Sequence, residues 1–552
     1  MLSAIAHLFR LARAGIVLAQ HGVRFVPKGT KAPLALHLLR WVTAPIRLVT
    51  WPLRWGTPRD QRVAVALTRL GPSYVKLGQF LGTRADLIGE ELASDLRHLQ
   101  DRLPPFSMAE ARLAIVEALG GKLEDHFAEF GPPVAAASIA QVHKAVTIGA
   151  DGQRRTVAVK ILRPGVERRF KNDLDSYYFA ARLIERLHAP TRRLKPVSVV
   201  DTLARTTALE MDLRLEAAAI SEMADNIAAD PGQKDGQFRV PSVDWRRTQR
   251  RVLTLEWIDG IPIADKAKLQ AAGYDLRALG LTVLRSFLRH AMRDGFFHAD
   301  MHQGNLLVEP DGKGGAKPEG RVVAVDFGIM GRLGPKERRF LAEILFGLIT
   351  RDYRRAAQVH FWAGYVPPQH PVEVFAQALR AIGEPIHGRT ADEISMADLL
   401  GQLFAYTEVF DMETRPELIN LQKTMIVVEG VARGLDPSLN IWTAAEPIAR
   451  DWIEANLGAV GALKDARDGA GDLAKFLAKF LGDVPALLAQ AERTFQALGD
   501  VARTGVRLDA LTIERLAAEQ ARRGRSGRVA LWIGALALLV IAGLFAVPSL
   551  LR

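Results

Sequence analysis

The sequence predicts an α+β fold of two lobes, with a helical extension at the N-terminus and a transmembrane helix at the C-terminus. Three observations support this prediction. Residues 126–262 contain strand-like runs of β-branched and apolar residues around a lysine. A longer helical stretch with acidic loops follows, and residues 529–551 are uncharged and mostly apolar. At 552 residues, the chain is long enough for more than one domain.

Composition narrows the class of protein. Lys and Arg outnumber Asp and Glu by 73 to 61, and such a surplus can hold a protein against anionic phospholipid as readily as against nucleic acid. The sequence contains no Cys, which excludes disulfides, thiolate zinc sites, cysteine-ligated iron–sulfur clusters and cysteine nucleophiles. The membrane signals described next favour a lipid partner, and we expect no nucleic acid.

Residues 529–551 are predicted to form a transmembrane helix. At about 1.5 Å per residue, a helix of this length covers roughly 34 Å, and the hydrocarbon core of a bilayer is about 30 Å thick. A buried core helix is the alternative, but such helices seldom run so far without a polar side. Arginines gather before the span and one follows it: Arg522, Arg523, Arg525, Arg528 and then Arg552. The positive-inside rule therefore keeps the large N-terminal part in the cytoplasm.

The N-terminal region, residues 1–59, contains a weaker membrane signal. Apolar residues recur at helical spacing while arginines fall to one side: Leu2, Ile5, Phe9, Ala12, Ile16 and Ala19 against Arg10, Arg13 and Arg24. A helix of this kind can lie in a bilayer interface or pack on the protein, and the pattern does not separate the two.

The rest of the chain divides into regions of different pattern. Residues 60–125 are helical, residues 126–262 are rich in strands, residues 263–450 are helical, and residues 451–528 form a further helical region. In the strand-rich region, residues 132–148 and 154–165 are predicted to form a β-hairpin followed by a third strand. Further strands are predicted at 238–245 and 250–260, and one long helix at 199–229. Short strands at 305–310 and 321–328 interrupt the helical region. A small strand-rich lobe with a lysine, followed by a larger helical lobe with acidic loops, is the plan of a protein-kinase-like fold.

The stretch “GFFHADMHQGNLLV”, residues 295–308, has two interpretations. His298, Asp300 and His302 could bind a metal ion, although alternate residues on a strand or loop rarely converge on one ion. Alternatively, Asp300 and Asn305 match the kinase catalytic loop H-R-D-x-x-x-x-N, in which the aspartate is the base and the asparagine binds magnesium. The spacing favours the second interpretation.

Two further motifs occur in the order that a kinase requires. Lys160 ends “VAVK”, the strand motif whose lysine neutralises nucleotide phosphates. Asp326 begins D-F-G after an apolar strand, at the position that binds magnesium. A surface lysine is the alternative for Lys160 alone, but three motifs in order and in the expected elements make chance agreement remote.

The lysine needs a carboxylate partner, and the predicted helix 199–229 carries three candidates: Glu210, Asp212 and Glu216. On a continuous helix, Asp212 and Glu216 share a side while Glu210 points elsewhere. One acidic side can therefore pair with Lys160 and the other with a different cation. A solvated charged face is the alternative for any one of them.

An alanine-rich segment stands where kinases have a glycine-rich phosphate loop. Its candidate nucleotide-binding residues are Val134, Ala135, Ala136, Ala137, Ser138, Ile139, Ala140, Gln141 and Val142. Ala135 to Ser138 occupy the turn before the second strand. Each Cβ restricts positive φ and holds the backbone amides farther from phosphate than glycine would, so the nucleotide geometry should differ.

Together these motifs resemble the UbiB/ADCK family of atypical kinase-like proteins, over residues 60–440. The matching stretches are “LGPSYVKLGQFLGTRADLI”, “LQDRLPPF”, “AAASIAQVH”, “AVKILRPG”, “FFHADMHQGN” and “AVDFG”. They include a K-x-G-Q signature at Lys76, Gly78 and Gln79, which ordinary kinases lack.

The resemblance implies a kinase-like fold whose N-terminal extension brings Lys76 and Gln79 into the active site as catalytic residues beside Asp300. It further implies that Glu210 and Asp212 form an E-x-D motif facing Lys76. The same resemblance makes Glu216 the partner of Lys160. ATP or ADP with Mg²⁺ is the implied cofactor.

The family supports ubiquinone (coenzyme Q) biosynthesis at the cytoplasmic face of the bacterial inner membrane and resembles a lipid-stimulated ATPase more than a protein kinase. The resemblance therefore implies membrane lipid, polyprenyl-phenol quinone precursors and ubiquinone-biosynthesis enzymes as partners. Older naming made such proteins 2-polyprenylphenol hydroxylases, but this sequence has no flavin fingerprint. A nucleotide-sensing scaffold for the quinone-synthesis enzymes and a true protein kinase are the alternative functions.

Two features depart from the family pattern. The family's catalytic loop reads H-A-D-P-H-P-G-N, and Met301 and Gln303 replace its prolines here, which would loosen the loop without removing Asp300 or Asn305. Bacterial members often end in two apolar spans, and only one is clear in this sequence.

Overall fold

The computed structural model describes most of the first 457 residues. The described ranges are 2–23, 61–82, 90–97, 103–149, 151–187, 195–230, 237–310, 320–387, 409–412, 416–439 and 441–457, with a few single positions between them. All of them belong to one compact unit, residues 1–457. The predicted transmembrane helix at 529–551 and most of the predicted region 451–528 lie outside them. Within the described ranges, each helix is too short or too polar to cross a bilayer.

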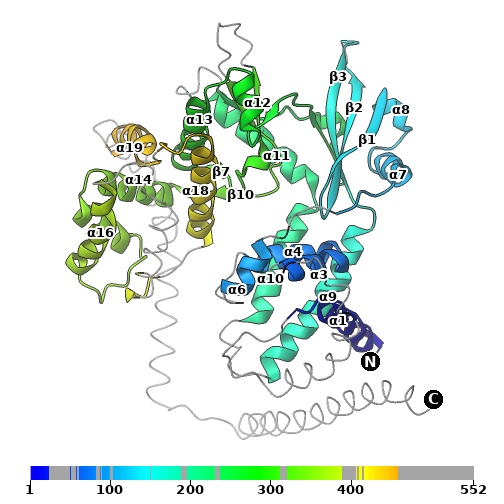
Figure 1. The fold of residues 1–552 in the computed structure, drawn as a ribbon, viewed down its shortest axis with the longest axis horizontal. Coiled ribbons are helices and arrows are strands. Elements are labelled where there is room, and N and C mark those ends of the chain that lie inside the picture. Colours follow the sequence, from blue (N-terminus) through cyan, green and yellow to red (C-terminus); the bar gives the residue numbers. More distant parts are fainter. Residues whose placement is uncertain are drawn as a thin grey trace, which may run out of the picture. The chain divides into compact units, whose positions relative to one another are not determined.

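The N-terminal extension is a cluster of helices (Figure 1). Its helices pack on two later helices through apolar side chains, among them Leu67, Tyr74 and Leu203. The extension helices are α1 (Leu2–Gln20), α3 (Arg62–Leu70), α4 (Pro72–Gly82) and α6 (Glu90–Arg97), and their partners are α9 (Val166–Leu187) and α10 (Pro196–Glu210). The first part of the helical pattern expected for residues 60–125, through α6, therefore forms a core separate from that of the strands, whereas its last part packs on them.

Helix α1 packs on α9 along one side. His7 Nδ1 lies 3.1 Å from Ser176 Oγ, and Arg10 donates to the Asn172 carbonyl at 3.1 Å. The opposite side leaves Phe9 73% exposed. Of the two alternatives for this segment, packing on the protein is observed for one side, and contact with a bilayer stays a prediction.

The N-lobe is built on an antiparallel sheet in the order β1-β2-β3-β5. Its strands are β1 (Glu129–Ala136), β2 (Ala140–Ile148), β3 (Arg154–Leu162) and β5 (Val252–Glu256), and α7 (Met108–Leu119) and α8 (Leu123–His126) pack against it. β3 ends three residues before the predicted boundary at 165, because Pro164 has no N–H to donate to a neighbouring strand.

The long helix predicted at 199–229 is wrong, because the chain breaks into two helices at Asp212. α10 ends at Glu210, and α11 runs over Leu213–Ala228. Asp212 has extended backbone angles, φ −117° and ψ 92°, and its side chain accepts the Arg214 N–H at 3.2 Å. An aspartate that caps a new helix in this way stabilises its first turn and separates it from the helix before it.

The C-lobe contains a second four-stranded sheet, a two-stranded ribbon and a set of helices. The sheet has the order β4-β9-β8-β6 and the ribbon joins β7 to β10. The strands are β4 (Phe238–Arg239), β6 (Ile261–Pro262), β7 (Phe296–His298), β8 (Leu306–Pro310), β9 (Gly320–Ala324) and β10 (Met330–Arg332). The helices are α12 (Lys266–Ala271), α13 (Leu276–Arg289), α14 (Pro335–Ile349), α15 (Tyr353–Trp362), α16 (Val372–His387), α18 (Pro416–Leu435) and α19 (Ile441–Leu457). The strands at 305–310 and 321–328 are thus observed as β8 and β9.

Arg239 of β4 connects the sheets of the two lobes. Its guanidinium donates to Glu256 of β5 at 2.9 and 3.0 Å and to Glu309 of β8 at 2.7 Å. A planar guanidinium with several donors can satisfy two carboxylates at once. This contact ties the edge strand of the N-lobe sheet to the C-lobe sheet.

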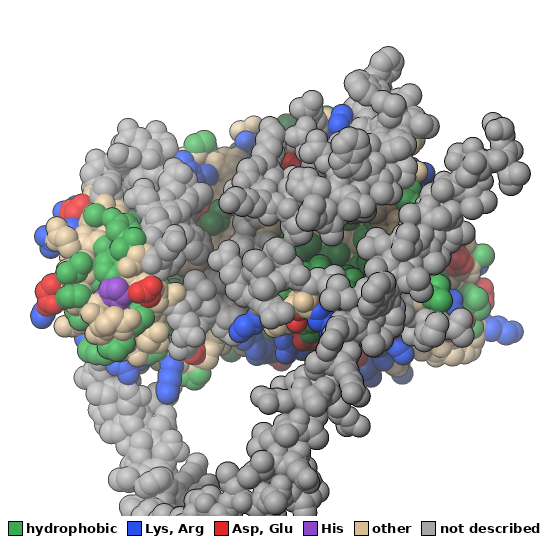
Figure 2. All heavy atoms as spheres, turned by 90° about the horizontal axis from the view of Figure 1, so that it is seen from below, with side chains coloured by type: hydrophobic (Ala, Val, Ile, Leu, Met, Phe, Trp, Pro, Cys, Tyr) green, Lys and Arg blue, Asp and Glu red, His purple; other side chains and the backbone are tan. Residues whose placement is uncertain are grey.

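Charged side chains of both signs mix on the described surface. In Figure 2, Lys and Arg side chains lie beside Asp and Glu along the face shown. Arg332 of β10, for example, donates to Glu222 of α11 at 2.8 Å. Such mixing is the ordinary state of a surface that faces water.

Candidate active site

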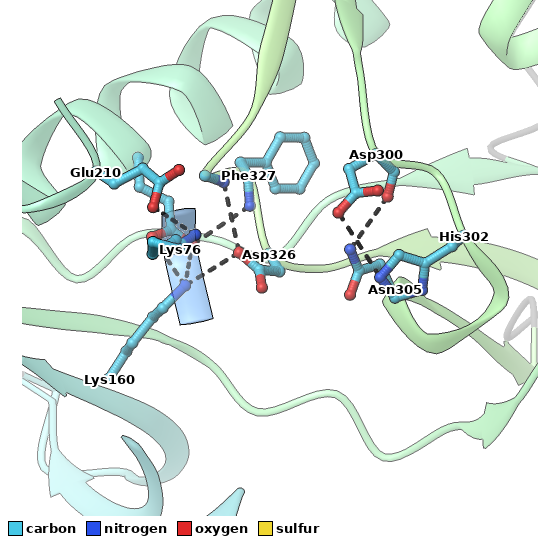
Figure 3. A network of polar contacts seen from close by, with 10 residues as sticks. Lys76, Lys160, Glu210, Asp300, His302, Asn305, Asp326 and Phe327 are labelled. Carbon is cyan, nitrogen blue, oxygen red and sulfur yellow. Dashed lines mark hydrogen bonds and ion pairs between the residues drawn. The ribbon is translucent and has the colours of Figure 1, made fainter. Parts of the chain in front are cut away.

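Lys160 lies at the centre of a polar network between the lobes (Figure 3). β3 positions it, with Val142 of β2 and Leu253 of β5 as its neighbours in the sheet. Its Nζ atom donates to both carboxylate oxygens of Glu216, at 2.8 and 3.0 Å, and to Asp326 Oδ1 at 3.0 Å. Glu216, on α11, is therefore the carboxylate partner of Lys160, and the geometry decides between it and Glu210.

Asp326 follows β9 in a backbone conformation that few residues adopt. Its φ is +65°, in the left-handed region, which aspartate tolerates better than most residues. The next residue, Phe327, is buried, and its N–H points back to Glu216 Oε1 at 3.3 Å. Glu216 thus holds both Lys160 and the backbone after Asp326, so one carboxylate fixes two parts of the site.

The charges of this network stabilise one another. The positive charge of Lys160 holds the pKa of Asp326 well below its usual range. Burial raises the pKa of Glu216, and Lys160 opposes that effect. Burial also acts to lower the pKa of Lys160, but the two carboxylates outweigh it and the pKa is raised. Asp326 is 53% exposed, so solvent screens part of its attraction to the lysine.

The loop after β7 carries Asp300 and Asn305. Asn305 Nδ2 donates to the Asp300 carbonyl at 3.1 Å, and the Asn305 carbonyl accepts the Val325 N–H at 2.8 Å. These bonds connect the Asp300 loop to the residue that precedes Asp326. His298 is buried, and its Nδ1 accepts the Asp300 N–H at 3.0 Å. Asp300 and Asn305 therefore lie on one rigid loop beside the Lys160 network.

The alternative metal site at His298, Asp300 and His302 has no support from the geometry. His298 Nδ1 is occupied by the Asp300 N–H, and His302 Nε2 lies 3.7 Å from Asp300 Oδ2. Among the residues that the structure describes, no group of three or more His, Asp or Glu side chains is arranged to hold an ion.

The K-x-G-Q signature lies on α4, close to the acidic residues between α10 and α11. Lys76 Nζ is 2.5 Å from Glu210 Oε2, and both side chains are largely buried. Gly78 allows this helix to pack closely, because a Cβ there would be 2.5 Å from Leu67 Cδ1. Gln79, three residues after Lys76, is half-buried on the same helix.

Asp212 has a different role from Glu210. It caps α11, and both of its carboxylate oxygens accept from the Arg214 guanidinium, at 2.9 and 2.6 Å. That pairing holds the pKa of Asp212 below its ordinary value. Of the two acidic residues expected to face Lys76, the structure therefore pairs only Glu210 with it.

The alanine-rich segment spans the end of β1, a turn and the start of β2. Val134 and Ala135 are exposed, Ala136, Ala137 and Val142 are half-buried, and the remaining four, Ser138, Ile139, Ala140 and Gln141, are buried. Ile139 and Ala140 belong to the main hydrophobic core. Their side chains therefore serve packing, and any contact of these two with a nucleotide would come from the backbone.

Comparisons with known proteins agree with this geometry. Residues 98–360 match the ABC1 atypical kinase-like domain, and residues 379–440 match the UbiB helical domain. The chain is 39% identical to the probable protein kinase UbiB of Marinobacter nauticus over 466 residues, which cover 84% of this chain and 82% of that protein. The chain belongs to the UbiB family of atypical kinase-like proteins.

Other UbiB relatives show similar agreement. The probable protein kinase UbiB of Xanthomonas euvesicatoria is 39% identical over 444 residues, 80% of this chain and 78% of that protein. The probable protein kinase UbiB of Xylella fastidiosa is 38% identical over 459 residues, which cover 83% of this chain and 80% of that protein. Among solved structures, the complex of Rv3197 with erythromycin from Mycobacterium tuberculosis has a TM-score of 0.46 and 24% identity, and the match covers 67% of this chain and 90% of that one.

Several contacts that shape this UbiB site were not predicted from the sequence. The Phe327 N–H and Arg163, which lie within quoted motif stretches, and Thr424, which lies in none, all make contacts that bridge distant parts of the chain. Thr424 of α18, for example, donates to the Ala299 carbonyl at 3.0 Å, directly before Asp300. Met301, which replaces a family proline, is 1% exposed and packs in the core, so apolar packing fixes the loop at that point.

The residues at the UbiB site suit a nucleotide with Mg²⁺. Asp326 supplies a carboxylate, and Asn305 supplies an amide oxygen at the end opposite to the nitrogen that bonds Asp300. Carboxylate and amide oxygens are the ligands that Mg²⁺ accepts from proteins. Lys160 supplies a cation of the kind that phosphates need. The donor set therefore fits the cofactor that the family implies.

Proposed function

We propose that this UbiB-family chain binds ATP or ADP with Mg²⁺ at the Lys160 network and hydrolyses ATP. The observation that carries the proposal is the convergence of Lys160, Glu216 and Asp326 from three separated parts of the chain, with the Asp300 loop bonded to the residue before Asp326. Phosphoryl transfer requires a cation, carboxylates and a base close together, and these residues supply all three kinds of group.

Each residue has a distinct task in this proposal. Lys160 holds the phosphates, the alanine-rich segment from Val134 to Val142 covers them, and Asn305 and Asp326 hold Mg²⁺. Mg²⁺, when bound, neutralises charge on the terminal phosphates. Asp300 orients the attacking oxygen of water or of an acceptor. Lys76 and Gln79 approach from α4 and shape access to the reacting groups.

The biological role that fits best is support of ubiquinone biosynthesis at the inner face of the bacterial cytoplasmic membrane. ATP turnover would drive the extraction or presentation of polyprenyl-phenol quinone precursors to the biosynthetic enzymes. Membership of the UbiB family, the basic surplus and the predicted span at 529–551 support this role. Protein phosphorylation is the second candidate, because the relatives are named probable protein kinases.

Phosphate release from the full-length protein in lipid nanodiscs tests the proposal. The Asp300→Asn variant is expected to lose lipid-stimulated release, because the amide cannot take a proton. Asp151→Asn, in the exposed turn before β3, is the matched control and should retain it. Undiminished release by Asp300→Asn would end the assignment of Asp300.

Complementation separates turnover from a scaffold role. A strain that lacks the gene should not regain ubiquinone with Asp300→Asn or Asp326→Ala if ATP turnover is required. Restoration by both variants would favour the scaffold. If the wild-type protein transferred labelled γ-phosphate to another polypeptide and Asp300→Asn did not, that result would favour the protein kinase.

A further inference from the structure

The turn of the alanine-rich segment is held by hydrogen bonds from outside its own hairpin. The Ala137 carbonyl accepts from Nε and Nη2 of Arg163, at 3.0 and 2.9 Å. The Arg163 N–H donates to the Ile139 carbonyl at 2.8 Å, and the Leu103 N–H donates to the Ala136 carbonyl at 3.3 Å. The carbonyls of Ala136, Ala137 and Ile139 are therefore held by Arg163, directly after β3, and by Leu103 of the N-terminal extension.

The same arginine reaches the extension directly. Arg163 Nη2 donates to the Pro104 carbonyl at 2.9 Å, and its guanidinium carbon lies 5.6 Å from the centre of the Phe106 ring. Gln141 is 1% exposed. Its Oε1 accepts the Phe106 N–H at 2.9 Å, and its Nε2 donates to the Phe106 carbonyl at 3.4 Å. Residues 103–106 and the turn thus form one hydrogen-bonded unit with Arg163 at its centre.

The chemistry of this unit suits a fixed loop. A guanidinium is planar and presents several donors in a fixed fork, so it can hold two carbonyls in one geometry, whereas the rotatable donors of an ammonium group fix that geometry less firmly. Alanines restrict the backbone where kinases have glycines. A loop that is ordered before its ligand arrives loses less conformational entropy on binding, so it binds more tightly than a mobile one.

We propose that Arg163 is a positioning residue for the nucleotide, because it locks the alanine-rich turn to residues 103–106 of the extension. This inference rests on the nucleotide binding proposed above. It makes the extension, which also carries Lys76, part of the machinery that sets nucleotide affinity. Arg163 acts through the turn and needs no contact with the phosphates.

The test compares variants of the full-length protein in nanodiscs. Arg163→Gln removes the two-carbonyl fork, so we expect faster amide hydrogen exchange in residues 135–140 and about tenfold weaker binding of MgADP, the loss that follows from charge-assisted hydrogen bonds of ordinary strength. Arg163→Lys keeps the charge without the fork and should be weakened similarly. Arg155→Gln, also on β3 and paired with Asp151, is the control and should match wild type in both measurements.

The outcomes separate this inference from the function on which it rests. Wild-type affinity in Arg163→Lys would overturn it, because charge alone would then suffice. Unchanged exchange or unchanged MgADP affinity in Arg163→Gln would overturn it as well. If wild-type protein bound no MgADP at all, the proposed function would fail, and the exchange measurement, which needs no nucleotide, would still decide whether Arg163 holds the turn.

Discussion

The Nζ atom of Lys160 lies 3.0 Å from the Asp326 carboxylate that the sequence predicts as a magnesium ligand. Lysine and metal ion therefore compete for one carboxylate as long as no phosphate engages the lysine. Removing a positive charge at this distance should strengthen the attraction of the site for a cation.

We expect Lys160→Met to bind Mn²⁺ without nucleotide about tenfold more tightly than wild type, since one neighbouring charge at this separation changes a binding free energy by about 1.4 kcal/mol or more. Electron paramagnetic resonance of free Mn²⁺ measures this affinity. Arg154→Met provides the control, because Arg154 is paired with Glu129 at the start of β3, six residues before Lys160 along the strand. Equal affinities for all three proteins would rule out competition at Asp326.

The Lys76–Glu210 pair should be coupled energetically. Lys76→Met leaves the largely buried Glu210 carboxylate without the charge of Lys76. Glu210→Gln likewise leaves the largely buried Lys76 without the charge of Glu210. We expect the double variant to be less destabilised than the sum of the two single variants, by about 0.5–3 kcal/mol, as for other contacting pairs. Urea unfolding of the four proteins gives this coupling energy. Strict additivity would show that the contact contributes nothing.

Arg239 should stabilise the arrangement of the two sheets. Arg239→Met leaves Glu256 and Glu309 facing each other without their shared cation, and we expect a loss of roughly 2–3 kcal/mol in the free energy of unfolding. Arg154→Met removes an exposed pair with Glu129 instead and should cost less than about 1 kcal/mol. Similar unfolding midpoints for the two variants would contradict a special role for Arg239.

The C-lobe should lose stability in acid through His360. Burial lowers the pKa of His360 to about 4 from an ordinary value of 6.5, so the unfolded chain takes up the proton first as the pH falls. The contribution of His360 is therefore complete above pH 6.5 and is lost toward pH 4, at about 1.4 kcal/mol per pH unit. His360→Met should show a shallower decline in unfolding free energy between pH 6.5 and 4. Parallel curves for the two proteins would disprove this assignment.

Local patterns were enough to predict the strands that carry the site. The runs that became β2, β3, β8 and β9 alternate or concentrate β-branched residues, and a run of this kind specifies a strand without knowledge of its partners. Lys160 and Asp326 could be found because each ends a strand motif, and Asp300 and Asn305 because of the spacing between them. The sequence narrowed the carboxylate partner of Lys160 to three acidic residues, but local patterns alone could not choose Glu216 among them.

Contacts between distant segments could not be predicted in this way. Helical periodicity treats residues 199–229 as continuous, and a single Asp212 does not reveal whether it caps a helix or lies within one. Arg163 follows a motif lysine by three residues and resembles any surface arginine, because its two acceptors are carbonyls that every residue possesses. Every residue has a backbone carbonyl, so residue types do not show which carbonyl a side chain binds. A hydrogen bond from a side chain to the backbone therefore cannot be predicted from a single sequence.

The break in the helix at Asp212 also places α10 and α11 in two different hydrophobic cores. The α10 side chains Val200 and Leu203 pack with the extension helices, whereas the α11 side chains Leu213 and Ile220 pack in the core shared with the C-lobe. Lys76–Glu210 and Lys160–Glu216 are thus anchored to different hydrophobic cores on either side of Asp212. A substitution that disturbs the core of the extension should therefore weaken the first ion pair more directly than the second.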